Sequence, residues 1–349
     1  MEHLGYSVYV STFSHQKVFL RALEDRDFYV FTSLHIVEEQ NEQYKQQAED
    51  MLKWLKCKGF KVIADISKRT LAFFGERDVV KLAKRLGITV LRIDCGFSEE
   101  EMIGLAKDFP IAFNASTMPL PLVRKLKQVS PQIFAIHNYY PRAYTGLSIR
   151  QFQQINGELE KEGIEVVAFI PNSYKSRGPI YEGLPTLEHE RYETSAVNYF
   201  EMKLDLKVAH IVLADLGLEV LDEKIIKEYE TNKVVSIPCI IDKKFEYLYN
   251  QVFTIRIDSP DCAYRLQESR EFATAGSIVE PFNCQDRGIG CITCDNLNYG
   301  RYSGEIQIIR ECLPRDGRVN VIGKIDKDYL GLTKFIQNGC QIQLIKGEG

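Results

Sequence analysis

The first 238 residues repeat one pattern, in which a short apolar run rich in β-branched residues is followed by an amphipathic helical stretch. Nearly continuous apolar runs are typical of parallel strands that are covered on both faces. Eight such runs occur here, at residues 4–10, 28–36, 60–67, 89–96, 111–117, 133–140, 165–171 and 210–215. Eight strands that alternate with helices predict a (β/α)8 TIM barrel.

An open, doubly wound sheet is the competing interpretation of the same pattern. Such a sheet normally has a glycine-rich phosphate-binding turn after its first strand. Residues 10–14 occupy that position, and they read Val-Ser-Thr-Phe-Ser. Gly59 and Gly87 stand where helices should end before the next strand, and Ser98 with Glu101 has the pattern of a capping box. The sequence therefore favours the barrel.

After Pro238 the strands become short and alternate between apolar and polar residues, as in 252–257 and 318–322. This alternation is typical of antiparallel strands with one solvated face. We therefore expect two domains, a barrel at 1–238 and a smaller, mostly antiparallel β domain at 239–349.

Composition argues against several classes of partner. The net charge of −4 gives no general attraction to nucleic acid or to anionic membranes. No apolar run is long enough to cross a membrane and the amino terminus enters the first strand directly, so we expect neither a membrane span nor a signal peptide. The nine cysteines are scattered and odd in number, which fits a reducing compartment better than a disulfide framework. These features indicate a cytoplasmic protein without nucleic-acid or membrane partners.

Polar and ionisable side chains stand at the carboxyl ends of nearly all the predicted barrel strands, where the chemistry of a TIM barrel lies. An aspartate at any single end could merely cap the following helix, but capping does not explain a whole ring of polar residues. The candidate site residues at these ends, and in the loop after the seventh strand, are Asp65, Arg92, Asp94, Asn114, His137, Asn138, Tyr140, Arg142, Arg177, Glu182, Glu188, Arg191 and Asp215.

These side chains suit a small, anionic and polyhydroxylated substrate. Carboxylates that face each other across a barrel mouth can divide acid and base roles once their environments separate their pKa values. The guanidinium groups available to bind phosphate or carboxylate are those of Arg92, Arg142, Arg177 and Arg191. The candidates for binding hydroxyl and amide groups are Asn114, His137, Asn138 and Tyr140.

We expect no cofactor and no metal. A pyridoxal-phosphate barrel would need a lysine at a strand end, and the first strand has none. His137 stands alone among the strand ends, whereas metal-dependent hydrolases usually cluster their histidines. Cys291 and Cys294 have zinc or redox spacing, but no second pair lies at a matching distance, so we interpret them as strand-filling residues.

Several longer segments resemble one protein family. They are His137-Asn138-Tyr139-Tyr140-Pro141-Arg142 with 145–148, Arg177-Gly178-Pro179 with 182–188 and Arg191, 92–94 with 96–98, 114–117, and in the second domain Asp295-Asn296, Tyr299, Arg301-Tyr302, Gly304-Glu305 and 318–323. Through these segments, and over essentially its whole length, the chain resembles the bacterial MupG-like 6-phospho-N-acetylmuramidases.

The resemblance implies a TIM barrel followed by a cyclophilin-like β domain. It also implies hydrolysis of the β-1,4 bond of MurNAc 6-phosphate–GlcNAc, which releases MurNAc 6-phosphate and GlcNAc during peptidoglycan recycling. Glycosidases of this kind use two carboxyl groups that flank the scissile bond. Motif context and strand-end position make Asp94 and Glu188 the first candidates for this pair, with Asp65 and Asp215 in reserve. Catalysis assisted by the 2-acetamido group of the substrate is an open alternative.

The second domain has two interpretations. It completes the pocket with Asn296, Tyr299, Arg301 or Tyr302, in its own subunit or across a homodimer, or it is a structural or dimerising module. The rival function from another class is a non-catalytic phosphosugar- or peptidoglycan-binding protein that uses the same polar ring. Release of free GlcNAc distinguishes the enzyme from the binding protein.

Overall fold

The computed structural model describes residues 3–24, 27–34, 43–93, 96–130, 132–172, 175–274 and 278–347. Asp94, a predicted catalytic residue, lies outside these ranges. The chain divides into two compact units, Met1–Glu219 and Val220–Gly349. The boundary expected after residue 238 falls inside strand β9, Val234–Ile241, and the whole of that strand belongs to the second unit.

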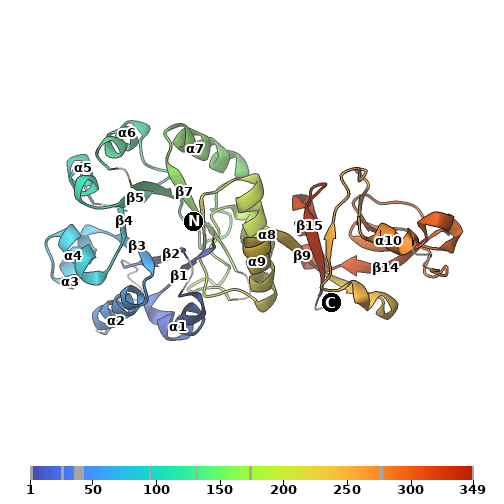
Figure 1. Ribbon diagram of the computed structural model, residues 1–349. Helices are drawn as coiled ribbons and strands as arrows, with labels where there is room; N and C mark the ends of the chain where they lie inside the picture. Colours follow the sequence, from blue (N-terminus) through green and yellow to red (C-terminus); the bar gives the residue numbers. More distant parts are fainter. Residues whose placement is uncertain are drawn as a thin grey trace. The chain divides into compact units, whose positions relative to one another are not determined.

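Within the described residues, the first unit forms a closed barrel of eight parallel strands in sequence order, which confirms the predicted TIM barrel (Figure 1). The barrel closes where β1 pairs with β8, with Gly5 beside Val212. Gly5 permits this close packing, because a side chain there would meet the carbonyl oxygen of Tyr29 at 2.6 Å. The strands are β1 (Gly5–Ser7), β2 (Tyr29–Ser33), β3 (Lys61–Ile66), β4 (Val90–Ile93), β5 (Ile111–Asn114), β6 (Ile133–Ile136), β7 (Glu165–Ile170) and β8 (His210–Leu213).

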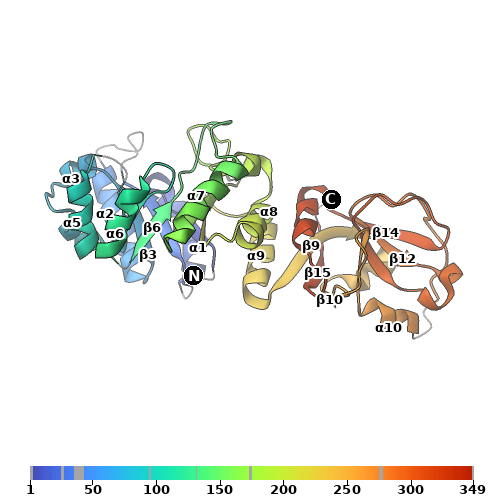
Figure 2. The same ribbon diagram turned by 90° about the horizontal axis from the view of Figure 1, so that it is seen from above.

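Helices surround this barrel, as the view from above also shows (Figure 2). They are α1 (Phe13–Leu20), α2 (Tyr44–Cys57), α3 (Lys68–Phe74), α4 (Val79–Leu86), α5 (Glu99–Asp108), α6 (Leu120–Val129), α7 (Ile149–Lys161) and α8 (Ser195–Phe200). Two helix ends follow directly from the sequence. Ser98 and Glu101 form the expected capping box at the start of α5, and Gly87 ends α4 with a left-handed φ of 75°.

The strands of the barrel bury apolar side chains on both faces. The cluster that fills the barrel includes Phe31, Ile63 and Phe169. Residues of the opposite face, such as Phe113, pack with side chains of the surrounding helices, such as Leu159. This two-sided burial explains why the strands appear in the sequence as nearly continuous apolar runs.

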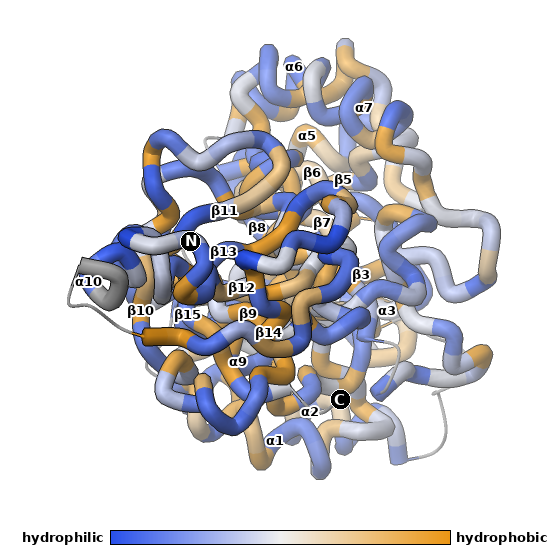
Figure 3. Tube along the Cα trace, turned by 90° about the vertical axis from the view of Figure 1, so that its right-hand side faces the viewer, coloured by the Kyte–Doolittle hydropathy of each residue, from blue (hydrophilic) through white to orange (hydrophobic). Residues whose placement is uncertain are grey.

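The second unit contains a seven-stranded sheet in its described part, with the order β10-β15-β9-β14-β12-β13-β11. Its pairings are antiparallel except between β15 and β9, which confirms a mostly antiparallel second domain. Hydrophobic residues of β9 and β14 appear as orange segments in Figure 3. Besides β9, the elements are α9 (Val220–Asn232), β10 (Val252–Thr254), β11 (Ala263–Arg265), α10 (Ser269–Thr274), β12 (Cys291–Asp295), β13 (Ile306–Ile309), β14 (Val319–Ile325) and β15 (Gln341–Lys346).

Candidate active site

Four predicted site residues each follow, by two positions, a side chain that fills the barrel. They are Asp65 after Ile63, Arg92 after Val90, Asn114 after Ala112, and Asn138 after Ile136. Because side chains alternate between the two faces of a strand, this spacing directs all four toward the inside of the barrel at its carboxyl end.

The four side chains form one polar network. Asp65 Oδ1 and Arg92 Nη1 are 2.7 Å apart in an ion pair whose side chains are at most 8% exposed. Arg92 Nη2 donates to Asn138 Oδ1 at 2.5 Å, and Asn114 Nδ2 donates to the same oxygen at 3.4 Å. Ser33, which ends β2, donates from Oγ to Asp65 Oδ2 at 3.5 Å. The barrel mouth therefore holds a connected set of carboxylate, guanidinium and amide groups.

His137 lies on the other face of the same strand end. It follows Ala135, which packs with the helices, and the His137 ring lies 4.6 Å from the Phe152 ring of α7. The Nε2 atom of His137 is 2.8 Å from Asn156 Oδ1 on the same helix. Burial lowers the pKa of His137 to about 4, so the ring is neutral near pH 7. These contacts favour a structural role for His137 over the substrate-binding role expected from its position.

Two tyrosines that the sequence did not single out belong to the mouth. The guanidinium carbon of Arg177 lies 3.9 Å from the centre of the Tyr9 ring. Tyr139 packs edge-on against Phe169 of β7, and its pKa is affected by Arg177, Asp65 and Arg92. Burial is the largest cause and raises the pKa of Tyr139, so its phenol keeps its proton near pH 7. Tyr139 therefore stays neutral, with its ring packed among the aromatic side chains that fill the barrel.

Asp215 orders the loop that carries Arg177. Its Oδ2 accepts hydrogen bonds from the backbone N–H groups of Asn172 at 2.8 Å and Leu184 at 3.1 Å. Its Oδ1 accepts one from the backbone of Arg177 at 2.8 Å. Asp215 is only 1% exposed, and this burial raises its pKa to about 6. Its position holds the start of the loop close to its end and fixes Arg177 near the mouth.

Glu188 and Arg191 form a second ion pair, which we call the rim clip. Arg191 Nε and Nη2 donate to the two carboxylate oxygens of Glu188 at 2.8 and 2.7 Å. The same oxygens accept hydrogen bonds from the backbone N–H groups of Tyr144 and Gly146, both at 2.7 Å. The bond from Arg191, aided by the two backbone donors, lowers the pKa of Glu188 from 4.5 to about 2. A carboxyl group with this pKa cannot serve as a general acid near neutral pH.

Arg191 uses its remaining donors on the backbone. Its Nη1 and Nη2 groups donate to the carbonyl oxygens of Tyr140, Arg142, Glu182 and Gly183. All five N–H donors of its guanidinium are engaged, and Arg191 is fully buried. This arrangement favours a structural role for Arg191 over the anion-binding role that its residue type suggested.

The rim clip contacts Tyr140, Arg142 and Glu182 at their backbone carbonyl groups, which accept hydrogen bonds from Arg191. The side chains of Arg142 and Glu182 are exposed. Among the described residues, the Arg142 guanidinium has no ion-pair partner, so it is available to a ligand.

In the second unit, Asn296 is fully buried and donates from Nδ2 to Asn320 Oδ1 at 2.9 Å. Arg301 lies over the ring of Tyr302, with its guanidinium carbon 5.0 Å from the ring centre. Cys294 is buried in β12, and burial raises its pKa to about 12. The thiol is therefore unreactive near neutral pH, as expected of a strand-filling cysteine.

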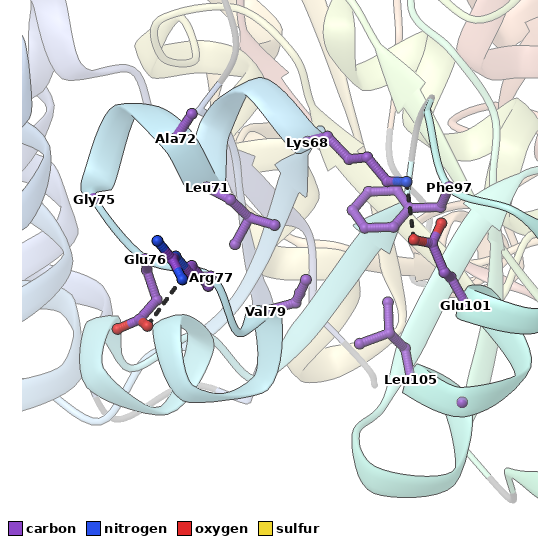
Figure 4. Close-up of a pocket in the computed structure, with 11 residues that line it drawn as sticks. Lys68, Leu71, Ala72, Gly75, Glu76, Arg77, Val79, Phe97, Glu101 and Leu105 are labelled. Atoms are coloured by element: carbon purple, nitrogen blue, oxygen red, sulfur yellow. Dashed lines mark hydrogen bonds and ion pairs between the residues drawn. The ribbon is translucent and has the colours of Figure 1, made fainter.

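A groove of about 840 Å³ lies on the outer wall of the first unit (Figure 4). It runs between α3, the start of α4, and α5, and its lining is mostly apolar, with Leu71, Val79 and Leu105 among the side chains. Lys68 reaches Glu101 at 2.9 Å beside the Phe97 ring. The groove contains none of the predicted site residues.

Neither a metal site nor a membrane span is found in the described part of the chain. No group of three or more His, Cys, Asp or Glu side chains there is placed to hold a metal ion. No helix among the described residues is long and apolar enough to cross a membrane.

The fold and the mouth network define a (β/α)8-barrel protein with an ionisable polar site at the carboxyl ends of its strands. The models of the 6-phospho-N-acetylmuramidase family match residues 4–227 with their N-terminal part and 233–345 with their C-terminal part. The chain belongs to this family, and it is accordingly a glycosidase.

Solved structures agree with the fold. A conserved protein of unknown function from Enterococcus faecalis is 28% identical, with a TM-score of 0.87 over 99% of this chain and 97% of that chain. An uncharacterized B. cereus protein is 20% identical, with a TM-score of 0.76 over 98% of this chain and 99% of that chain, and shows the fold alone. None of the curated proteins compared with the chain matches it.

Proposed function

We propose that the chain hydrolyses the β-1,4 bond of MurNAc 6-phosphate–GlcNAc and releases MurNAc 6-phosphate and GlcNAc. The observation that carries this proposal is the Asp65–Arg92–Asn138–Asn114 network at the barrel mouth of a chain from this family. The network offers a carboxylate for the reacting centre, together with amide groups that suit sugar hydroxyls and the acetamido group.

Glycoside hydrolysis needs a proton for the leaving oxygen and a carboxylate for the developing positive charge at the anomeric carbon. We assign the carboxylate role to Asp65, because it faces the mouth. Asp94, one of the two carboxyl groups expected to flank the bond, is then assigned the proton-donor role on the strength of its sequence position. The bond from the anomeric carbon to the leaving oxygen breaks, that oxygen takes the proton, and water supplies the new hydroxyl.

The other carboxyl groups have contacts that suit positioning. Glu188 was the expected partner of Asp94, but four hydrogen bonds occupy its oxygens. Asp215 has a pKa of about 6, which suits a general acid, yet its oxygens accept three backbone hydrogen bonds in a buried position. We therefore propose that Glu188 and Asp215 shape the loops around the mouth.

The same proposal places the reaction in the cytoplasm, as a step of peptidoglycan recycling. A 6-phosphorylated disaccharide is produced when a phosphotransferase transporter imports the sugar, so its hydrolase would act inside the cell. The ligand is then this small anionic disaccharide, with no nucleic-acid or membrane partner.

The direct test is incubation of the purified protein with MurNAc 6-phosphate–GlcNAc and detection of free GlcNAc. We expect release from the phosphorylated disaccharide and much less from the unphosphorylated one. Asp94→Asn should lower turnover by orders of magnitude while leaving thermal unfolding unchanged. Tight binding of the disaccharide without any release of GlcNAc would instead support the non-catalytic phosphosugar-binding protein.

A further inference from the structure

Two tyrosines on the barrel rim expose their rings to solvent on unusual backbone. Tyr144 is 91% exposed and Tyr181 is 68% exposed. Their φ angles are 64° and 61°, in the left-handed region that side chains other than glycine rarely adopt. Holding two large rings in solvent on strained backbone is unfavourable unless the surrounding structure imposes it. Such residues point to a function for the exposed rings.

The rim clip imposes the backbone of Tyr144. Glu188 accepts the N–H of Tyr144 with one carboxylate oxygen and that of Gly146 with the other. A side chain at Gly146 would approach the Glu188 Oε2 atom to 2.7 Å, so only glycine fits beside the clip. The ring of Tyr144 is therefore presented by a backbone that is fixed on both sides.

The same clip joins the segments that carry the two tyrosines. Arg191 donates to the carbonyl of Arg142, two residues before Tyr144, and to that of Glu182, directly after Tyr181. One buried guanidinium thus binds the backbone of both segments that carry these tyrosines.

These segments are continuous with the mouth. Thr186 donates from Oγ1 to the carbonyl of Asn138, whose side chain belongs to the mouth network. A Cβ atom on Gly178 would lie 2.9 Å from the hydroxyl of Tyr181, so the Tyr181 side chain folds back beside the residue that follows Arg177. The segment that carries Tyr181 is therefore joined to the residues of the mouth.

We propose that Tyr144 and Tyr181 form an aromatic subsite for the leaving sugar, an N-acetylhexosamine ring. This inference rests on the proposed function. The charged, phosphorylated sugar suits the buried guanidinium and carboxylate groups of the mouth, and the uncharged sugar next to it lies farther out. The apolar face of a pyranose ring packs against the flat face of a phenol, and a ring on fixed backbone loses little conformational entropy on binding. The rim clip positions this subsite.

The first experiment compares two substrates. One is MurNAc 6-phosphate–GlcNAc, and the other is the glycosyl fluoride of MurNAc 6-phosphate, whose leaving group has no sugar ring. For the double variant Tyr144→Ala/Tyr181→Ala, we expect the ratio of kcat/KM for the disaccharide to that for the fluoride to fall about tenfold. The double variant with phenylalanine at both positions should keep the wild-type ratio, as should Tyr247→Ala, which removes a half-exposed tyrosine from the second unit. An unchanged ratio in the double alanine variant overturns the subsite.

The second experiment needs no turnover and so separates this inference from the proposed function. Saturation-transfer NMR with the β-methyl glycoside of GlcNAc should show contact with the wild-type protein and none with the double alanine variant. Absence of contact with the wild type, or equal contact with both proteins, overturns the subsite. If the wild type cleaves neither substrate but binds the glycoside through these tyrosines, the proposed hydrolysis fails and the sugar subsite stands.

Discussion

The barrel contains two carboxylate–guanidinium pairs with different surroundings. In the mouth, Arg92 reaches the side chains of Asp65 and Asn138. In the rim clip, Arg191 and Glu188 bind mainly backbone groups besides each other. A pair that is connected to other side chains can exchange a partner for a ligand without moving the chain. A pair that holds backbone groups cannot let go of them without disordering the loop.

This difference divides residues that look equivalent in the sequence. Asp65 and Glu188 were both candidate catalytic carboxylates, and Arg92 and Arg191 were both candidate anion binders. We propose a chemical role for Asp65 and Arg92 and a loop-ordering role for Glu188 and Arg191. Neutralising each carboxylate in turn should give the largest difference between the two pairs.

Asp65→Asn should lower turnover of the phosphodisaccharide about 10³-fold or more, because the reacting centre loses its carboxylate while the shape of the side chain is kept. Glu188→Gln should lower it only about tenfold, because the amide keeps part of the clip. Steady-state kinetics measured well below the unfolding temperature of each variant checks both values. Equal losses in the two variants, with equal KM, would return Glu188 to the catalytic pair.

Arg191→Met should lower the free energy of unfolding by about 3 kcal/mol or more, because it leaves the Glu188 carboxylate and several buried carbonyl groups without their donor. Urea denaturation measures the loss. The matched control is Arg142→Met on the same rim, whose exposed side chain has no ion-pair partner among the described residues and should change stability little. If the two variants unfold alike, Arg191 does not hold the rim.

Strand alternation at the carboxyl ends of β3 to β6 accounts for the polar network of the mouth. Asp65, Arg92, Asn114 and Asn138 are each two positions beyond an interior side chain, and all four meet. The same alternation turns His137 outward, which a list of polar residues at strand ends does not reveal. Because neighbouring residues of a strand point to opposite faces, His137 packs against α7 while Asn138 lies in the mouth.

Other features required long-range contacts that the sequence does not display. In the sequence, Tyr9 and Tyr139 resemble ordinary core aromatic residues. In the structure, Asp215 after β8 binds the backbone of Arg177, and the Arg177 guanidinium lies over the Tyr9 ring. The strands become short and alternating after Pro238, so Pro238 looked like the end of the barrel domain. Pro238 lies within β9, where it is paired with β15. The pairing of β9 with β14 begins one residue later, at Cys239.

Arg177→Ala should erase most of the preference for the phosphorylated over the unphosphorylated disaccharide, a change of about 10²-fold in the ratio of kcat/KM values. The reason is that Arg177 brings a guanidinium to the mouth. The guanidinium of the rim clip, in contrast, is already bound to the Glu188 carboxylate. Arg142→Ala is the parallel variant, and it should show the loss instead if the exposed guanidinium reads the phosphate. An unchanged preference in both variants means that neither arginine binds it.

The smallest expected effect is the pH dependence of the rim clip. The pKa of Glu188 falls from 4.5 to about 2 on folding, so the stability it adds is fully present above about pH 5 and is lost as the pH falls toward 2. Because this carboxylate is partly exposed and screened by solvent, we expect it to contribute about 1 kcal/mol.

Urea denaturation between pH 5 and 2.5 should therefore show a shallower decline for Glu188→Gln than for the wild type. Glu101→Gln, which removes a half-exposed ion pair with Lys68, should follow the wild-type curve more closely, since solvent screens that pair more strongly. Parallel curves for the wild type and Glu188→Gln would show that the clip is not a charged pair in solution, and the contrast with the mouth would then rest on Asp65 and Arg92 alone.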